Sequence, residues 1–287
     1  MTYEMAMRNN RFEGWYFKHQ HNDQTIAFIP GRAKSGSFIQ VIGNNKSLHF
    51  DMPSLRQEQG VIYAGDCMFS EHGAVIKLPN ISGSILYGPF TPLRSSIMGP
   101  FRHLPMECRH EVISMGHDLH GSLKVYGQEI DFEGGRGYIE SDSGSSFPRS
   151  YLWLQCNVFS EPCSVVVSIA SIPFAGLRFT GCICAIMYKG REYRLATYSG
   201  VHILSAEPER IVLAQGKLLL KIDIMCATSG HPLRSPIHGG MNGIIHENNH
   251  ACARFKLWEN GAQVFDLQTK NAGYEYVINA SPASNTL

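Results

Sequence analysis

Short runs rich in Val, Ile, Phe and Tyr recur along the chain at intervals of roughly ten residues, and glycine or proline separates most of them. Examples are TIAFIPG, SFIQVIG, VIYAGDCMF, SVVVSIASI and GCICAIMY. Apolar residues at helical spacing with a capping residue extend over no more than a turn or two. The sequence therefore predicts an all-β protein with very little helix, whose antiparallel strands form a sandwich or barrels.

The pattern occurs twice. Trp15 and Trp153 each begin a strand that is followed by a polar turn and a second strand with a proline near its end. A similar pair of hairpins, LKVYGQEIDFEGGRGY and FKLWENGAQVFDLQTKNAGY, comes near the end of each half. Chance similarity between amphipathic hairpins is the alternative explanation. We predict two antiparallel barrels in tandem, over residues 1–148 and 149–287, and a small barrel of this kind holds one apolar ligand.

The charge of the chain limits its partners. A formal net charge of +1, with no run of five like charges, argues against binding to nucleic acid, which needs clustered Lys and Arg. The expected partner is an apolar small molecule. The N-terminal sequence MTYEMAMRNN lacks the apolar segment of a signal peptide, and no apolar run is long enough to span a bilayer. We therefore predict a cytoplasmic protein without a transmembrane segment, which leaves peripheral membrane contact and the oligomeric state open.

The cysteines and histidines are not spaced in the sequence as the ligands of a metal site would be. Without a secretion signal, the eight cysteines are expected to be free and mostly buried thiols. Cys182 and Cys184 are too close together for a Cys-x-x-Cys site, and the thirteen histidines are scattered. The sequence predicts neither a metal nor a cofactor.

The segment from Arg136 to Asn157 combines acids and aromatic residues at the start of a strand. With a period of two, Tyr138, Glu140 and Asp142 share one strand face, and so do Tyr151, Trp153 and Gln155. Large rings beside a few fixed hydrogen-bonding groups are typical of a ligand cavity.

Two other segments show the same alternation. Glu13, Trp15 and Phe17 share a face in RFEGWYFK, and Tyr16 and Lys18 share the other. In Met106–Glu111, three charged residues alternate with His110. We interpret that segment as a salt-bridged outer face, with a contribution of His110 or Glu111 to the cavity as the alternative.

Two blocks of the sequence resemble the tocopherol cyclase family. They are FEGWYFK and GRGYIE-x-D-x-G-x-SFP-x-x-Y-x-WLQCN, and the distance between them is similar as well. The resemblance implies two lipocalin-like barrels in tandem. For characterised members it implies closure of a chromanol ring from a prenylated hydroquinone, and the wider lipocalin-like group includes hydratases of isoprenoid double bonds. The chain departs from the family pattern at Ser143, where a tryptophan is expected, and at Ser141, where a basic residue is usual.

Cyclisation of this kind requires an acid that protonates an alkene, aromatic faces that stabilise the cation, and a polar group that orients the phenol. A carboxyl group in an apolar cavity can serve as the acid, because desolvation raises its pKa. The candidate acids are Glu140, Asp142 and Glu13. The candidate substrate-binding residues are Trp15, Tyr138, Arg149, Tyr151, Trp153 and Gln155.

Three functions remain open: an enzyme that protonates an isoprenoid double bond, a lipocalin-like carrier of an apolar molecule, and a structural interaction protein. An unpaired carboxyl in a dry cavity favours the enzyme, because such burial is unfavourable unless function requires it. An acid paired with Arg149 or Lys18 favours a structural role, since a basic partner lowers the pKa of the acid.

Overall fold

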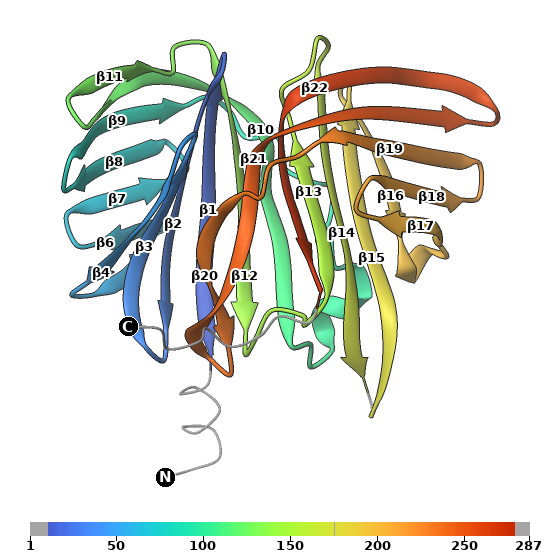
Figure 1. The fold of residues 1–287 in the computed structure, drawn as a ribbon, viewed down its shortest axis with the longest axis horizontal. Helices are drawn as coiled ribbons and strands as arrows, with labels where there is room; N and C mark the ends of the chain where they lie inside the picture. Colours follow the sequence, from blue (N-terminus) through green and yellow to red (C-terminus); the bar gives the residue numbers. More distant parts are fainter. Residues whose placement is uncertain (1–10, 175, 279–287) are drawn as a thin grey trace. The chain divides into compact units, whose positions relative to one another are not determined.

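A computed structural model describes residues 11–174 and 176–278, and these residues form two antiparallel sheets (Figure 1). The chain divides into two compact units. Unit 1 contains the described residues up to Leu93 together with His110–Ser146 and Arg234–Asn242. Unit 2 contains Arg94–Arg109, Phe147–Leu233 and the described residues from Gly243 onwards. The division into domains at 1–148 and 149–287 stays a prediction, and the proposed absence of a signal peptide concerns residues that lie outside the described ranges.

The first sheet runs in the order β4-β3-β2-β1-β12-β10-β9-β8-β7-β6-β5, with β11 paired to β10. Its strands are β1 (Phe12–His21), β2 (Gln24–Ala33), β3 (Gly36–Gly43), β4 (Ser47–Met52), β5 (Leu55–Glu58), β6 (Val61–Ala64), β7 (Cys67–Ser70), β8 (Gly73–Leu78), β9 (Ile81–Tyr87), β10 (Cys108–Val125), β11 (Gln128–Asp131) and β12 (Gly135–Gly144). Most neighbours are consecutive in sequence because short turns connect them. The exceptions are β1, which lies beside β12 and brings the start of the first half against its end, and β12, which lies beside β10 on its other side.

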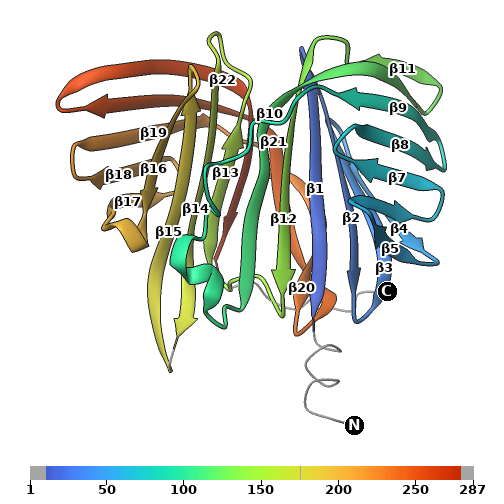
Figure 2. The same ribbon diagram turned by 180° about the vertical axis from the view of Figure 1, so that it is seen from behind.

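The second sheet runs in the order β16-β15-β14-β13-β22-β21-β19-β18-β17, with β20 paired to β21. Its strands are β13 (Tyr151–Cys156), β14 (Cys163–Phe174), β15 (Leu177–Tyr188), β16 (Arg191–Ala196), β17 (His202–Glu207), β18 (Arg210–Gln215), β19 (Leu218–Cys226), β20 (His231–Ile237), β21 (Gly240–Glu259) and β22 (Ala262–Val277). The view from behind shows β13 beside β14 and β1 beside β12 as in Figure 1 (Figure 2).

The second sheet repeats the strand order of the first from β4 to β7, with β1 equivalent to β13 and β12 equivalent to β22, and the first sheet continues with β6 and β5. The all-β, antiparallel fold predicted from the sequence is confirmed. Closure of the sheets into barrels is not confirmed. Within the described residues each sheet is open, and its edge strands are β4 and β5 in the first sheet and β16 and β17 in the second. Strands β5, β6 and β7 have four residues each, so they offer few hydrogen bonds with which to close the first ladder.

Each sheet packs one face around its own apolar core. In unit 1, Trp15 and Phe17 of β1 and Ile139 of β12 belong to that core. In unit 2, Leu152 and Leu154 of β13 do so instead. Because side chains alternate along a strand, Trp153 lies on the face opposite to its core. The two tryptophans begin equivalent hairpins, yet Trp15 points towards the core of its sheet and Trp153 points away from its core. A shift of one residue along a strand is enough to reverse the face to which a side chain points.

Each unit takes in a short segment from the other half of the sequence. Residues 234–242 join unit 1, where the side chain of Gln40 exchanges two hydrogen bonds with the backbone of Arg234. Residues 94–109, which include the 3-10 helix η1 (Gly99–His103), join unit 2 beside η2 (Thr197–Ser199). There the side chain of Arg194 donates hydrogen bonds to Ser95 and to the carbonyl of Ser96.

The cysteines differ in part from expectation. Cys226 of β19 and Cys252 of β21 form a disulfide, with their Cα atoms 4.9 Å apart. The two are cross-strand partners, a proximity that depends on strand register and that spacing in the sequence did not reveal. The other six are free, and all but Cys108 are buried. None of the helices in the described residues has the length and apolar character required to cross a membrane.

Candidate active site in unit 1

The candidate site begins with the alternation of β12. Ile139 points into the apolar core, so Tyr138, Glu140 and Asp142 point to the other face. Tyr138 is fully buried and Glu140 is 5% exposed. The hydroxyl of Tyr138 donates a hydrogen bond of 2.5 Å to Glu140 Oε2. The predicted sharing of a face by these residues is therefore confirmed.

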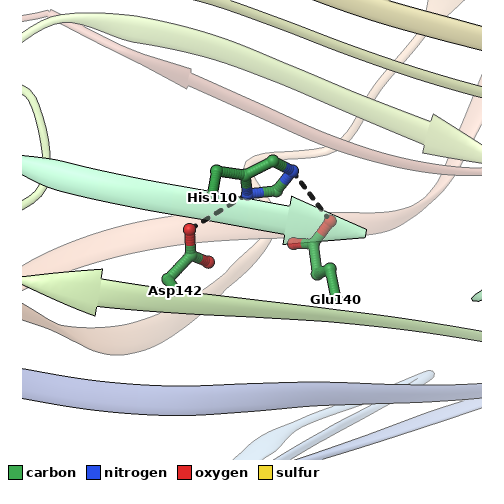
Figure 3. A group of neighbouring side chains, drawn as sticks. All are labelled: His110, Glu140 and Asp142. Atoms are coloured by element: carbon green, nitrogen blue, oxygen red, sulfur yellow. Dashed lines mark hydrogen bonds and ion pairs between the residues drawn. The ribbon is translucent and has the colours of Figure 1, made fainter. Parts of the chain in front are cut away.

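A histidine from the neighbouring strand completes the group. Strand β10 lies beside β12, and His110 near its start lies between the two carboxylates (Figure 3). His110 Nδ1 is 3.0 Å from Asp142 Oδ1, within hydrogen-bond distance, and Nε2 forms a longer ion pair of 3.5 Å with Glu140 Oε2. Nε2 makes no hydrogen bond within the described part of the chain. We call His110, Glu140 and Asp142 the acid–imidazole triad.

Electrostatics keeps the imidazole of the triad protonated. Burial by itself lowers the pKa of His110, but the negative charges of Glu140 and Asp142, with the hydrogen bond to Asp142, outweigh burial and raise that pKa to about 9. Burial and the neighbouring Glu140 hold the pKa of Tyr138 well above its usual range, so its hydroxyl keeps its proton. At neutral pH the group thus contains an imidazolium, flanked by two carboxyl groups and a neutral phenol.

Strand β1 borders the triad on the other side of β12. In the β1–β12 register, Tyr16 is paired with Glu140 and Lys18 with Tyr138. Side chains of cross-strand partners point to the same face, so both lie on the triad's side of the sheet. Lys18 is 1% exposed, and Tyr16 is buried too. The triad therefore lies on a covered face of the sheet, where electrostatic interactions are stronger than in water.

The same three side chains are the one group among the described residues with the composition of a metal site. Their potential ligand atoms lie within 4.8 Å of one another. A metal ligand must be a neutral imidazole, whereas the pKa of His110 is about 9. A cation would have to displace this proton, so the protonated state of His110 favours acid–base chemistry at this group. The absence of a metal stays a prediction.

The other predicted acid is in a different setting. Glu13 forms an ion pair of 2.6 Å with Arg32 of β2, and its side chain is 33% exposed. An exposed pair of this kind contributes about 0–1 kcal/mol to stability. Trp15, two residues later, belongs to the core of unit 1. Arg149 is exposed in the bend before β13. Their roles in catalysis and substrate binding stay predictions.

The remaining predicted residues are in unit 2. The hydroxyl of Tyr151 donates a hydrogen bond to Glu275 Oε2. Trp153 and Gln155 lie on the same strand face, and both are buried, Gln155 completely. The structure thus brings Tyr138, Glu140 and Asp142 together in unit 1, and Tyr151, Trp153 and Gln155 on one face in unit 2. That both groups bind one ligand stays a prediction.

His110 is a residue of the group whose place the sequence left open. The charged residues of Met106–Glu111 predict a salt-bridged outer face with His110 on the other face, and the alternative is that His110 or Glu111 reaches the cavity. In the structure His110 is buried between two carboxylates. The sequence did offer one indication: His110 can be neutral, and it lies on the strand face opposite the charged residues of that segment. It could not be matched to β12 without knowing that β10 is the neighbour.

Comparison with known proteins identifies the family. The profile of the family described as "Tocopherol cyclase-like" matches residues 79–277, which include the whole acid–imidazole triad. The chain belongs to the tocopherol cyclase-like family. A relative from Oryza sativa subsp. japonica, described as "Probable tocopherol cyclase, chloroplastic", is 26% identical over 208 residues. That match covers 66% of this chain and 44% of the relative, so the chain spans less than half of the relative's length.

Solved structures share the fold of this family member. CghA in complex with Sch210972 superposes with a TM-score of 0.60 at 11% identity, covering 94% of this chain and 89% of CghA. Kievitone hydratase from Nectria haematococca gives a TM-score of 0.51 at 11% identity, covering 93% and 89%. At this level of identity the likeness demonstrates a common fold, and it supports the lipocalin-like architecture expected from the sequence.

Proposed function

We propose that this protein is an acid–base enzyme that protonates a double bond of a prenylated hydroquinone or related isoprenoid and adds an oxygen nucleophile to the resulting cation. The observation that carries the proposal is the buried His110 imidazolium between Glu140 and Asp142. Membership of the tocopherol cyclase-like family supports ring closure. The hydratase among the structures of similar fold supports the related addition of water.

The triad supplies the acid in two steps. In the free protein the proton resides on His110. When an apolar substrate covers the site, exclusion of water disfavours separated charges, and the proton moves from Nε2 to Glu140 across the 3.5 Å contact. Asp142 holds Nδ1–H and thereby fixes the tautomer of the neutral imidazole. The product is a carboxylic acid in an apolar setting, which is the form that general acid catalysis requires.

The bond changes then balance. Glu140 gives its proton to one alkene carbon, and a tertiary cation forms at the other. The phenol oxygen of the substrate, or a water molecule, attacks that cation and forms a C–O bond. The attacking oxygen loses its proton to the carboxylate of Glu140, which restores the starting charge of the triad. The reaction consists of proton transfers and the formation of one C–O bond with no net oxidation or reduction, so the proposed steps use no redox cofactor.

The test follows turnover and the origin of the proton together. The protein is incubated with a prenylated hydroquinone in D2O, and products are analysed by mass spectrometry. Cyclisation is expected to give an isomer carrying one carbon-bound deuterium, and hydration to give a product with added water. Glu140→Gln should lower the rate by about 100-fold or more, a typical effect for a general acid. Glu275→Gln is the matched control, since Glu275 is also buried and accepts a tyrosine hydroxyl.

A lipocalin-like binding protein is the second candidate. The observation in its favour is that both carboxylates of the triad have protein partners, as they would in a structural ion-pair network. Binding of the prenylated hydroquinone without turnover by the parent protein would favour this candidate. Equal turnover by the parent and Glu140→Gln would show that the acid is elsewhere. The cytoplasmic location and peripheral membrane contact stay predictions.

A further inference from the structure

A buried amide in unit 2 lacks the hydrogen bonds that its position demands. Asn249 of β21 is 2% exposed. Its Oδ1 and Nδ2 atoms are both buried and have no hydrogen-bond partner within the described ranges. Buried side-chain amides are normally paired, and an exception requires an explanation. Its neighbour Asn248 shows the usual case, because its amide nitrogen donates to Thr228.

A β-bulge positions Asn249. Asn248 is paired with Tyr274, but Ala251 is paired with Ala272, so the ladder between β21 and β22 shifts by one residue. Asn249 and His250 consequently lie opposite the single residue Gly273. Ala251 and Ala272 point into the core, so the two bulged residues are directed to the other face. Bulges occur often beside functional sites, where they reorient a side chain.

Further amides surround the bulge on that face. Gln155 of β13 is the partner of Gly273 on the opposite side of β22, and it is completely buried. His250 Nδ1 lies 3.3 Å from Asn271 Oδ1. Gly273 adds no side chain between Gln155 and the bulge. The face therefore presents several amide groups around a position without a side chain.

We propose that Gln155, Asn249 and Asn271 form an amide site that binds a neutral hydroxyl or carbonyl group of an apolar ligand. An amide offers one acceptor and one donor group, which matches a hydroxyl better than an ion. Glu247 precedes Asn249 by two residues and is 1% exposed, so an anion would meet a carboxyl group nearby. Trp153, two residues before Gln155, provides an apolar ring on the same face.

The proposal concerns binding in unit 2 and does not require turnover. It relies on the proposed function for the choice of probe: a prenylated hydroquinone and its dimethyl ether, which keeps the ring and the prenyl chain but has a methyl group in place of each hydroxyl proton. Affinity is measured by tryptophan fluorescence and by titration calorimetry. We expect the parent to bind the hydroquinone at least about tenfold more tightly than the ether, the effect of one good hydrogen bond. Asn249→Leu should bind both probes with equal affinity.

The melting temperature separates a ligand site from a structural amide. Asn249→Leu is expected to melt at or above the temperature of the parent, because it removes two unpaired polar atoms. Asn248→Leu, the matched control, should melt lower and keep the preference for the hydroquinone. The proposal is overturned if the parent binds both probes equally or neither, or if Asn249→Leu keeps the preference. It is also overturned if Asn249→Leu melts as low as the control, which would indicate that water pairs the amide. If the parent prefers the hydroquinone to its ether but does not turn it over, the result counts against the proposed function alone.

Discussion

At the scale of single residues, the proton on His110 links the site to stability. The pKa of His110 in the folded protein is about 9, above the unfolded value of 6.5. A raised pKa stabilises the fold fully below pH 6.5, and the stabilisation disappears as the pH rises through 9. We expect the free energy of unfolding to fall by about 3 kcal/mol over this interval, since one pKa unit corresponds to about 1.4 kcal/mol.

Urea unfolding between pH 6.5 and 9.5 measures this loss. His110→Gln should be less stable than the parent at pH 6.5, because it leaves Glu140 and Asp142 without a cation between them. Its stability should change less across the same interval. A parent protein with constant stability up to pH 9.5 would contradict the pairing of His110 with these carboxylates.

Two other buried histidines should make the stability of the fold depend on pH in the opposite direction. His19 Nε2 lies 2.7 Å from the hydroxyl of Tyr87, and His117 Nδ1 lies 3.0 Å from Ser114 Oγ. Burial lowers the pKa of His19 to about 4 and that of His117 to about 3. A lowered histidine pKa stabilises the fold above pH 6.5, and this contribution is lost as the pH falls towards 4 and 3.

We therefore expect the free energy of unfolding to decrease by several kcal/mol as the pH falls below 6.5. The double variant His19→Gln/His117→Asn keeps hydrogen-bonding groups at both positions but removes both titrations. Its stability, measured by urea unfolding at pH 7 and pH 4.5, should depend less on pH. The exposed His202 provides the control, and His202→Gln should behave as the parent does.

At the scale of strands, the contact between β10 and β12 depends on a glycine. A Cβ atom on Gly137 would lie 2.1 Å from His117 Nε2, a distance that no pair of unbonded atoms tolerates. The rings of Tyr87 and Phe90 pack against His117, with centroids 4.7 and 4.8 Å away, so the imidazole has little freedom to move. Gly137→Ala should lower the free energy of unfolding by about 1–3 kcal/mol, the usual effect of overpacking.

Gly43 is the matched control in the same sheet. A Cβ atom there would have its nearest neighbour at 3.8 Å, which is ordinary contact. Gly43→Ala should therefore be neutral or slightly stabilising. Chemical unfolding of the two variants at pH 7 makes the comparison, and equal stability would show that β10 and β12 do not pack as described.

The difference between alternation within a strand and pairing between strands explains how much of the site the sequence could predict. The period of two placed Tyr138, Glu140 and Asp142 on one face, because alternation is a local property of any strand. It could not supply His110, which comes from another strand and joins the site only through the β10–β12 pairing. Trp15 and Trp153 show the same limit. Their hairpins are equivalent, yet a shift of one residue places them on opposite faces of their sheets.

At the scale of the whole molecule, the two sheets share most of their strand order but not their chemistry. Repetition in the sequence predicted the shared order, since each hairpin carries its own turn residues and alternation. Among the described residues, the triad is the one group of three His, Cys, Asp or Glu side chains whose potential ligand atoms lie within 4.8 Å of one another, and it belongs to unit 1. The exchange of short segments between the halves, like the Cys226–Cys252 disulfide, arises from contacts distant in sequence and gave no local signal.

The segment of residues 94–109 supplies the last prediction, because Arg194 makes several of the hydrogen bonds between it and the rest of unit 2. The guanidinium of Arg194 donates to Ser95 and to the carbonyl of Ser96, and it forms an ion pair of 2.7 Å with Glu192. Both side chains of this pair are mostly buried, at 15% and 7% exposure. Glu192 also accepts a hydrogen bond from the backbone of Arg94. Arg194→Met would leave the charge of Glu192 buried without its cation, which typically lowers stability by about 3–5 kcal/mol.

We expect Arg194→Met to unfold at lower urea concentration than the parent and to expose the segment before the rest of unit 2. Limited trypsin digestion should then cleave after Arg102 faster than in the parent. Arg178→Met, at an exposed position of β15, removes the same charge and should change neither result. Equal stability and equal cleavage of the two variants would show that Arg194 does not hold this segment.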